Sequence, residues 1–182
     1  MAKVNKTKYA LLGVLSLTSG SGYDIKKFCD STIAHFWNEN YAHIYPVLKD
    51  LEAEGLVSKT AEQNEGRPPK SVYSITDKGR EELHQWLILP VEDSPHRIEL
   101  LLKLFFSSDL PLENIIEKLT EARKKHESLL EDYQKAEDLL KADESLKDNK
   151  GLPLWLSTIS FGKYHAEAML KWCEETIQAI QK

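Results

Sequence analysis

A short run of polar side chains along one predicted helix is the part of this sequence best suited to chemistry. In the segment 38–57, NENYAHIYPVLKDLEAEGLV, apolar side chains recur at helical spacing and would bury one face of a helix. These apolar residues are Ile44, Val47, Leu48 and Leu51. The other face carries an amide, an imidazole, a phenol and an ammonium group, from Asn40, His43, Tyr45 and Lys49. Such groups form hydrogen bonds, so this face is suited to recognising a polar partner.

Patterns typical of enzymes and metal sites are absent from the sequence. The six histidines are scattered without an H-E-x-x-H motif, and Cys29 and Cys173 form no C-x-x-C pair. The GSG before Tyr23 lacks the lysine and the strand of a phosphate-binding loop, and there is no nucleophile elbow. We therefore predict a protein that is not an enzyme, has no catalytic residues and binds no metal or cofactor.

Composition places the chain among ordinary globular proteins. Its 182 residues are 41% hydrophobic and 29% charged, which suits one domain or two small ones. The formal net charge is -5, but residues 1–90 carry 11 basic and 11 acidic side chains, against 13 and 18 in residues 91–182. The negative balance thus lies in the second half and does not exclude nucleic acid as a partner. No segment is long enough to span a membrane, and we predict a cytoplasmic protein with no membrane partner.

The first half predicts three helices, two short strands and a fourth helix. Apolar spacing predicts helices at 8–17, at 23–37 and from near 40–42 to 54, where Gly55 can take the left-handed conformation that ends a helix. Pro46 fits only if this third helix begins near 40–42, because proline is tolerated around the first turn of a helix. The segments 56–62 and 71–76 predict strands joined by a turn rich in Gly and Pro, and a helix then starts at Thr76 or Asp77.

The second half predicts only helices after a break at LILPVEDSPHRIE, so we predict domains at 1–90 and 91–182. The helix 110–140 carries an apolar stripe with heptad spacing. Its members are Leu112, Ile115, Leu119, Ala122, His126, Leu129, Tyr133, Ala136 and Leu140. A stripe of this kind needs a partner helix, either in a second copy of the chain or in the last helix of the same chain, and the two can coexist. At its position in the stripe, His126 predicts a satisfied interface histidine rather than a pH switch.

The order of elements in the first half is that of a winged helix, so we predict a mainly α fold with a helical, coiled-coil-like second domain. In a winged helix the third helix enters the major groove of DNA, and the tip of the strand hairpin reaches phosphates or the minor groove. Arg67 and Lys70 lie at that tip, and Lys26 and Lys27 on the second helix could flank the DNA backbone. The alternative is a protein interaction module whose polar faces are solvated and never touch DNA.

The residues also resemble a known family. YALLGVLSL, GSGYDIKKF, IYPVLKDLEAEGLV and GRPPKSVYSITDKGREEL, in this order, resemble the N-terminal domain of the PadR family of transcriptional regulators across residues 7–88. RIELLLKLFFSSDLP and KYHAEAMLKW resemble the C-terminal helical domain of its longer members and of virulence activators related to AphA. The resemblance implies a winged helix for double-stranded DNA and a C-terminal domain for homodimerisation, as in a repressor that binds an inverted-repeat operator.

By position in these motifs, the helix that holds Tyr45 is implied to be the recognition helix. The expected DNA contacts are Lys26, Lys27, Asn40, His43, Tyr45, Lys49, Arg67 and Lys70. Lys49 is the only cation of the recognition helix. We therefore expect the phosphate contacts to come mainly from the strand hairpin, called the wing below, from Lys26 and Lys27 and from the tail lysines, Lys3, Lys6 and Lys8. The affinity for DNA should then depend strongly on salt.

The expected dimerisation residues lie on the heptad stripe and on the last helix. They are Leu112, Ile115, Leu119, Leu129, Tyr133, Trp155 and Trp172. Aromatic side chains gather late in the chain, at Trp155, Phe161, Tyr164 and Trp172. We expect them to form core and dimer interface, since large aromatics dominate such surfaces. The alternative is an apolar pocket for a small aromatic effector, since some relatives in the family bind phenolic acids or flat hydrophobic drugs.

Overall fold

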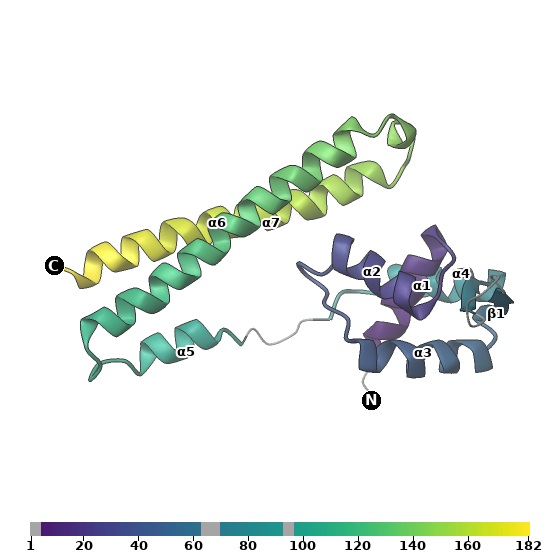
Figure 1. The fold of residues 1–182 in the computed structure, drawn as a ribbon, viewed down its shortest axis with the longest axis horizontal. Coiled ribbons are helices and arrows are strands. Elements are labelled where there is room, and N and C mark those ends of the chain that lie inside the picture. Colours follow the sequence, from purple (N-terminus) through teal and green to yellow (C-terminus); the bar gives the residue numbers. More distant parts are fainter. Residues whose placement is uncertain (1–4, 63–69, 93–96) are drawn as a thin grey trace. The chain divides into compact units, whose positions relative to one another are not determined.

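The computed structural model describes residues 5–62, 70–92 and 97–182, apart from the side chains of Tyr41 and Glu62. The chain divides into two compact units, Met1–Asp93 and Ser94–Lys182 (Figure 1). The first contains α1 (Lys6–Leu17), α2 (Gly22–Thr32), α3 (Tyr41–Ala53), β1 (Val57–Glu62), β2 (Lys70–Ile75) and α4 (Asp77–Leu87). The second contains α5 (Glu99–Phe105), α6 (Leu112–Ala142), a short 3-10 helix (Glu144–Leu146) and α7 (Leu152–Ile180). Within the described ranges, none of the helices is long and apolar enough to span a membrane.

Side-chain caps explain where α2, α3 and α4 of the first unit begin. At α2 the Ser21 hydroxyl accepts a hydrogen bond from the Asp24 N–H at 3.3 Å, and the Asp24 carboxylate accepts one from the Ser21 N–H at 2.9 Å. The Asn40 carboxamide oxygen caps α3, and the Thr76 hydroxyl accepts from the Gly79 N–H of α4 at 3.1 Å. Each cap satisfies a backbone N–H that has no partner inside the helix. The predicted helix starts are therefore confirmed.

The recognition helix predicted from the sequence, α3, is shaped by a proline and a glycine. Because it begins at Tyr41, Pro46 lies just past its first turn, where little backbone hydrogen bonding is lost. Gly55 has φ 70°, and the N–H groups of Gly55 and Leu56 donate to carbonyls of the last turn at 3.0 and 2.9 Å. This is the Schellman arrangement, and it confirms the predicted end of the helix.

The second helix is shorter than predicted. The sequence suggested a helix over 23–37, but α2 ends at Thr32 and a turn follows. The hydroxyl groups of Ser31 and Thr32 both donate to the Phe28 carbonyl, at 3.1 and 2.6 Å. Hydroxyl groups of this kind compete with backbone hydrogen bonds and weaken a helix, which accounts for the early end.

A continuous apolar core holds the first unit together. Its fully buried large side chains come from α1, α2 and α3 and are Leu11, Leu12, Ile25, Ile44, Leu48 and Leu51. The strands β1 and β2 form an antiparallel pair that runs from Val57 opposite Ile75 to Glu62 opposite Lys70. Gly20, before α2, exchanges backbone hydrogen bonds of 3.1 and 2.9 Å with Tyr73 of β2. The base of the wing is thus tied to the helices.

The second unit is built around a hairpin of two long helices, α6 and α7, which run side by side (Figure 1). Leu119 and Tyr133 of the heptad stripe are buried in it, at 0% and 8% exposure. Tyr133 lies so close to α7 that a Cβ on Gly162 would stand 2.3 Å from its ring. The last helix of the same chain is therefore a partner of the stripe. Leu119 and Tyr133, expected at the dimer interface, are both buried within the single chain.

The prediction that His126 is a satisfied interface histidine concerns a dimer, and in the single chain no hydrogen-bond partner for its ring is described. Its Nδ1 atom is buried without a hydrogen-bond partner, and its ring lies 5.6 Å from that of His165 on α7. Burial lowers the pKa of His126, and the nearby His165 and Lys125 lower it further. These surroundings therefore disfavour the charged form of the imidazole.

Candidate nucleic-acid interface

The polar residues predicted on the recognition helix are exposed on α3 or, for Asn40, at its N-cap. His43, Tyr45 and Lys49 are exposed, whereas Ile44 and Leu48 beside them are fully buried. Consecutive side chains of a helix are turned by about 100° from each other, because 3.6 residues make one turn, so sequence neighbours can differ in burial. The structure therefore leaves an imidazole, a phenol and an ammonium group free to meet a partner.

Asn40 and Tyr45 also have structural roles that the sequence did not reveal. The carboxamide oxygen of Asn40 accepts the Ala42 N–H at 3.0 Å and caps α3. Tyr45 is 53% exposed, yet a Cβ on Gly22 would stand 2.7 Å from its ring. The ring thus lies against the first residue of α2, and only glycine there leaves room for it. Tyr45 therefore packs α3 onto α2 while half of its surface faces outward.

Lys70 is the member of the predicted wing set that the structure describes. Lys70, at the start of β2, is 43% exposed, and its ammonium nitrogen lies 2.7 Å from Oδ2 of Asp24. The hydrogen bond from Lys70, followed by that from the Ser21 backbone, lowers the pKa of Asp24 to about 2. Sequence reasoning missed Asp24 as a neighbour of the wing. Arg67, the other predicted wing residue, lies outside the described residues.

The two predicted lysines of α2 differ in their surroundings. Lys27 is exposed. Lys26 forms an ion pair with Asp30, one turn further along α2, and only 11% of its side chain is exposed. An exposed lysine can approach a phosphate freely, whereas Lys26 would first have to leave its carboxylate partner. Lys27 is thus the more available cation of the pair.

The tail lysines that we expected at DNA phosphates are engaged within the first unit. Lys8 lies 2.7 Å from a carboxylate oxygen of Glu54 and 3.1 Å from one of Glu82, and it lowers the pKa of Glu82. Lys6 pairs with Glu92 at 3.3 Å. These ion pairs join α1 to the end of α3 and to α4. Lys6 and Lys8 are accordingly less available to phosphates than the sequence suggested, and Lys3 lies outside the described residues.

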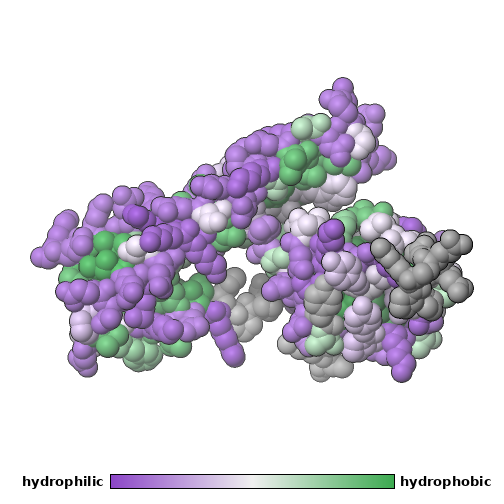
Figure 2. Space-filling view, in the orientation of Figure 1, coloured by the Kyte–Doolittle hydropathy of each residue, from purple (hydrophilic) through white to green (hydrophobic). Residues whose placement is uncertain are grey.

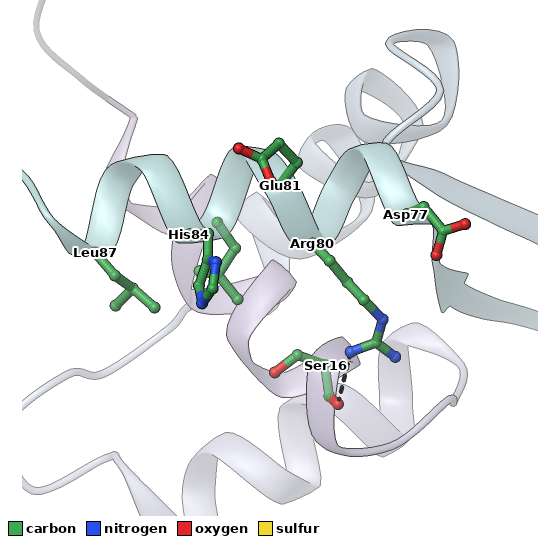
Figure 3. A pocket seen from close by; sticks show the side chains of 7 residues that line it. Ser16, Asp77, Arg80, Glu81, His84 and Leu87 are labelled. Carbon is green, nitrogen blue, oxygen red and sulfur yellow. Dashed lines mark hydrogen bonds between the residues drawn. The ribbon is translucent and has the colours of Figure 1, made fainter.

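A hollow of about 410 Å³ lies between the end of α1 and α4 (Figure 3). Arg80 crosses it and donates a hydrogen bond to the Ser16 carbonyl at 3.4 Å. Asp77, Glu81 and His84 line it as well, and all of them are exposed. Its charged groups have both signs and remain solvated, so the hollow favours no single class of ligand.

The late aromatic side chains are spread along α7. Trp155 and Trp172 are half-buried, whereas Phe161 and Tyr164 are 68% and 71% exposed. Trp155 lies against the turn before α7, where a Cβ on Gly151 would stand 2.9 Å from its ring. In the single chain, Phe161 and Tyr164 therefore offer surface to a partner rather than filling a core.

Comparison with known proteins agrees with this architecture. Residues 11–85 match the transcriptional regulator PadR-like family, and residues 96–181 match the virulence activator alpha C-terminal family. The negative transcriptional regulator PadR of Bacillus subtilis is 29% identical over 185 residues, which cover 96% of this chain and 97% of that protein. The relative is a regulator and not an enzyme, as the sequence predicts for this chain.

Solved structures share the fold over nearly the whole chain. B. subtilis PadR in complex with operator DNA matches with a TM-score of 0.84 and 27% identity, covering 97% of this chain and 99% of that one. The same protein in complex with p-coumaric acid matches with a TM-score of 0.73 and 28% identity, over 100% and 99% of the two chains. The Vibrio cholerae virulence activator AphA gives 0.74 and 28%, over 96% and 97%. These similarities confirm the predicted winged helix with a C-terminal helical domain.

Proposed function

Because this chain carries a PadR-like transcriptional regulator domain followed by a virulence activator alpha C-terminal domain, we propose that it is a repressor that binds an inverted-repeat operator as a homodimer. The exposed polar face of α3 is the observation that carries the proposal. The B. subtilis relative is named a negative transcriptional regulator, and its structure with operator DNA supports DNA as the partner here. A DNA partner also agrees with the predicted cytoplasmic location.

In the proposed complex, residues 1–90 form the DNA-binding domain and α3 enters the major groove. His43, Tyr45 and Asn40 offer hydrogen-bonding groups to base edges or phosphates, and Lys49 offers a charge. The phosphates beside the groove are contacted by the lysines of α2 and by the wing residues. We assign this role to Lys26, Lys27, Arg67 and Lys70.

Homodimerisation is proposed for residues 91–182, because this unit exposes large apolar side chains (Figure 2). They lie on α5, at the start of α6 and on α7, and α5 buries none of its residues within the described chain. Exposed apolar surface of this kind is typical of protein interfaces. The exposed or half-buried members of the predicted set remain available to a second copy, namely Leu112, Ile115, Leu129, Trp155 and Trp172. Two winged helices would then read two half-sites related by two-fold symmetry.

A small aromatic effector that releases the repressor from DNA is the last part of the proposal. The structure of B. subtilis PadR with p-coumaric acid supports it. The half-buried tryptophans of α7, Trp155 and Trp172, and their exposed neighbours Phe161 and Tyr164 supply aromatic surface for such a ligand. Replacing the exposed Tyr164 by leucine should change induction by phenolic acids while operator affinity stays the same.

Selection from a random pool of duplex DNA, at low and at physiological salt, tests the proposal. We expect enrichment of an inverted repeat that survives the higher salt. The double charge reversal Lys49→Glu and Lys70→Glu should abolish binding while circular dichroism shows that the chain is still folded. Lys171→Glu, the same reversal on the exposed surface of α7, is the matched control and should bind as the wild type does. Loss of all binding with salt and no enriched sequence would instead favour a protein interaction module.

A further inference from the structure

The carboxylate of Asp24 joins the start of the wing to the start of α2. Its Oδ2 atom accepts hydrogen bonds from the Ser21 N–H at 2.9 Å and from the Ser21 hydroxyl at 2.8 Å. The same oxygen lies 2.7 Å from the ammonium nitrogen of Lys70, the first residue of β2. One carboxylate thus serves both a helix cap and a lysine that we assign to the DNA interface.

Asp24 is held in this position without help from Lys70. The capping box with Ser21 orients the carboxylate. A Cβ on Gly20 would stand 2.9 Å from the Cβ of Asp24, so the glycine leaves room for it. The backbone bonds between Gly20 and Tyr73 keep β2 beside the start of α2. Asp24 is therefore an acceptor oriented by its own helix, and the long, partly exposed side chain of Lys70 is its ion-pair partner.

A DNA phosphate that contacts Lys70 must approach this fixed negative charge. An ammonium group has three N–H donors and can touch two anions, but the two anions then repel each other at close range. The pKa of Asp24, lowered to about 2 by Lys70 and Ser21, keeps the carboxylate charged at any pH used for DNA binding. Either Lys70 gives up its ion pair with Asp24, or the phosphate binds beside the Asp24 carboxylate and is repelled by it. Both possibilities lower the affinity for DNA.

We propose that Asp24 restrains Lys70 from DNA phosphates and thereby weakens the sequence-independent part of DNA binding. This inference rests on the proposed function, since it needs DNA as the partner. Phosphate contacts by lysine supply affinity that is independent of sequence, whereas base contacts by α3 supply specificity. Restraining one wing lysine therefore weakens binding to the large excess of non-operator DNA. The repulsion between Asp24 and phosphate thereby raises the specificity for the operator.

The test is the variant Asp24→Asn in the full-length chain. Asparagine keeps an oxygen that can accept the Ser21 N–H but carries no charge. Binding to a duplex of random sequence is measured by fluorescence anisotropy across a salt series. One additional phosphate contact should steepen the slope of log K against log salt by about 0.9 and raise affinity about 8-fold near 0.1 M salt. An unchanged slope and affinity would overturn the inference.

Lys70→Gln supplies the second arm of the test. If Asp24 acts through Lys70, Asp24→Asn should have no effect on DNA binding in a chain that already carries Lys70→Gln. Glu81→Gln removes the same charge from exposed surface on α4 and should not change the slope. A fall in affinity for Asp24→Asn that matches Lys70→Gln would also overturn the inference, because Asp24 would then orient Lys70 toward the phosphate.

Two outcomes separate this inference from the proposed function. Wild-type protein that binds no duplex even at low salt would refute DNA as the partner. Wild-type protein that binds, together with an Asp24→Asn variant of unchanged salt slope, would refute only the role of Asp24. Thermal melting by circular dichroism shows that the variants are folded, and Asp24→Gln replaces Asp24→Asn if the shorter amide fails to cap α2.

Discussion

A single methyl group at Gly79 tests how closely the wing is packed onto the helices. Gly79 lies in the first turn of α4, and a Cβ there would stand 2.1 Å from the carbonyl oxygen of Leu56 and 2.9 Å from Cγ1 of Ile75. Carbon and oxygen atoms normally approach no closer than about 3.3 Å. The nearest obstacle is a backbone atom, which cannot rotate away as a side chain can. Gly79→Ala must therefore displace α4 from the junction of α3 and β1.

That displacement strains a small group of hydrogen bonds. The Leu56 carbonyl accepts the Thr76 N–H at 3.1 Å, and the Thr76 hydroxyl accepts the Gly79 N–H at 3.1 Å and donates to the Gly55 carbonyl at 2.8 Å. Overpacking costs about 1–3 kcal/mol, and each weakened hydrogen bond costs up to about 1 kcal/mol. The helix preference of alanine offsets about 1 kcal/mol of this. We expect Gly79→Ala to lower the free energy of unfolding by about 2–4 kcal/mol.

Gly13→Ala is the matched control, because Gly13 lies inside α1 and a Cβ there would meet nothing within 4 Å. It should stabilise the first unit by about 0.5–1 kcal/mol. Thermal unfolding followed by circular dichroism should show the first unit melting roughly 10–20 °C lower in Gly79→Ala and slightly higher in Gly13→Ala. Equal melting temperatures for Gly79→Ala and the wild type would refute the reasoning.

The remaining predictions concern the recognition helix and the helical hairpin. Gly22→Ala should push the half-exposed ring of Tyr45 aside, so DNA affinity should fall in a titration while the melting temperature changes by less than about 5 °C; unchanged affinity would contradict this. His126 has a pKa below that of an unfolded histidine, so the hairpin is fully stabilised above about pH 6.5 and loses stability as the pH falls. His126→Gln should reduce that loss in urea unfolding measured at pH 7 and pH 5.5, and an identical loss would contradict it. Gly162→Ala should lower the free energy of unfolding of the hairpin by about 1–3 kcal/mol, because it displaces the buried Tyr133. A free energy of unfolding equal to that of the wild type would contradict this.

Much of the fold could be predicted because it depends on neighbours along the chain. The cap at Ser21, the left-handed Gly55 and the cap at Thr76 act within a few residues, so their signals are legible in the sequence. The exposed face of α3 follows from helical spacing alone. The capping pattern from Ser21 to Asp24 was also present in the sequence and could have singled out Asp24 as an ordered carboxylate.

The partners of the long charged side chains could not be predicted in this way. Lys8 donates to Glu54, which is 46 residues away in sequence, and Lys70 reaches back across the unit to Asp24. These contacts exist because tertiary packing brings separate elements together, so they cannot be predicted from spacing along the chain. The structure therefore shows ion pairs of Lys8, an expected phosphate contact, with Glu54 at the end of α3 and Glu82 on α4.

The heptad stripe shows the same limit. Its period determined that α6 needs a partner, and burial of Leu119 and Tyr133 confirms that the stripe is packed. An apolar stripe gains the same free energy against any complementary apolar surface, because the hydrophobic effect is not directional. Sequence by itself thus determined the elements, most of their ends and the need for a partner, whereas only the tertiary structure decided that α7 of the same chain packs against part of the stripe.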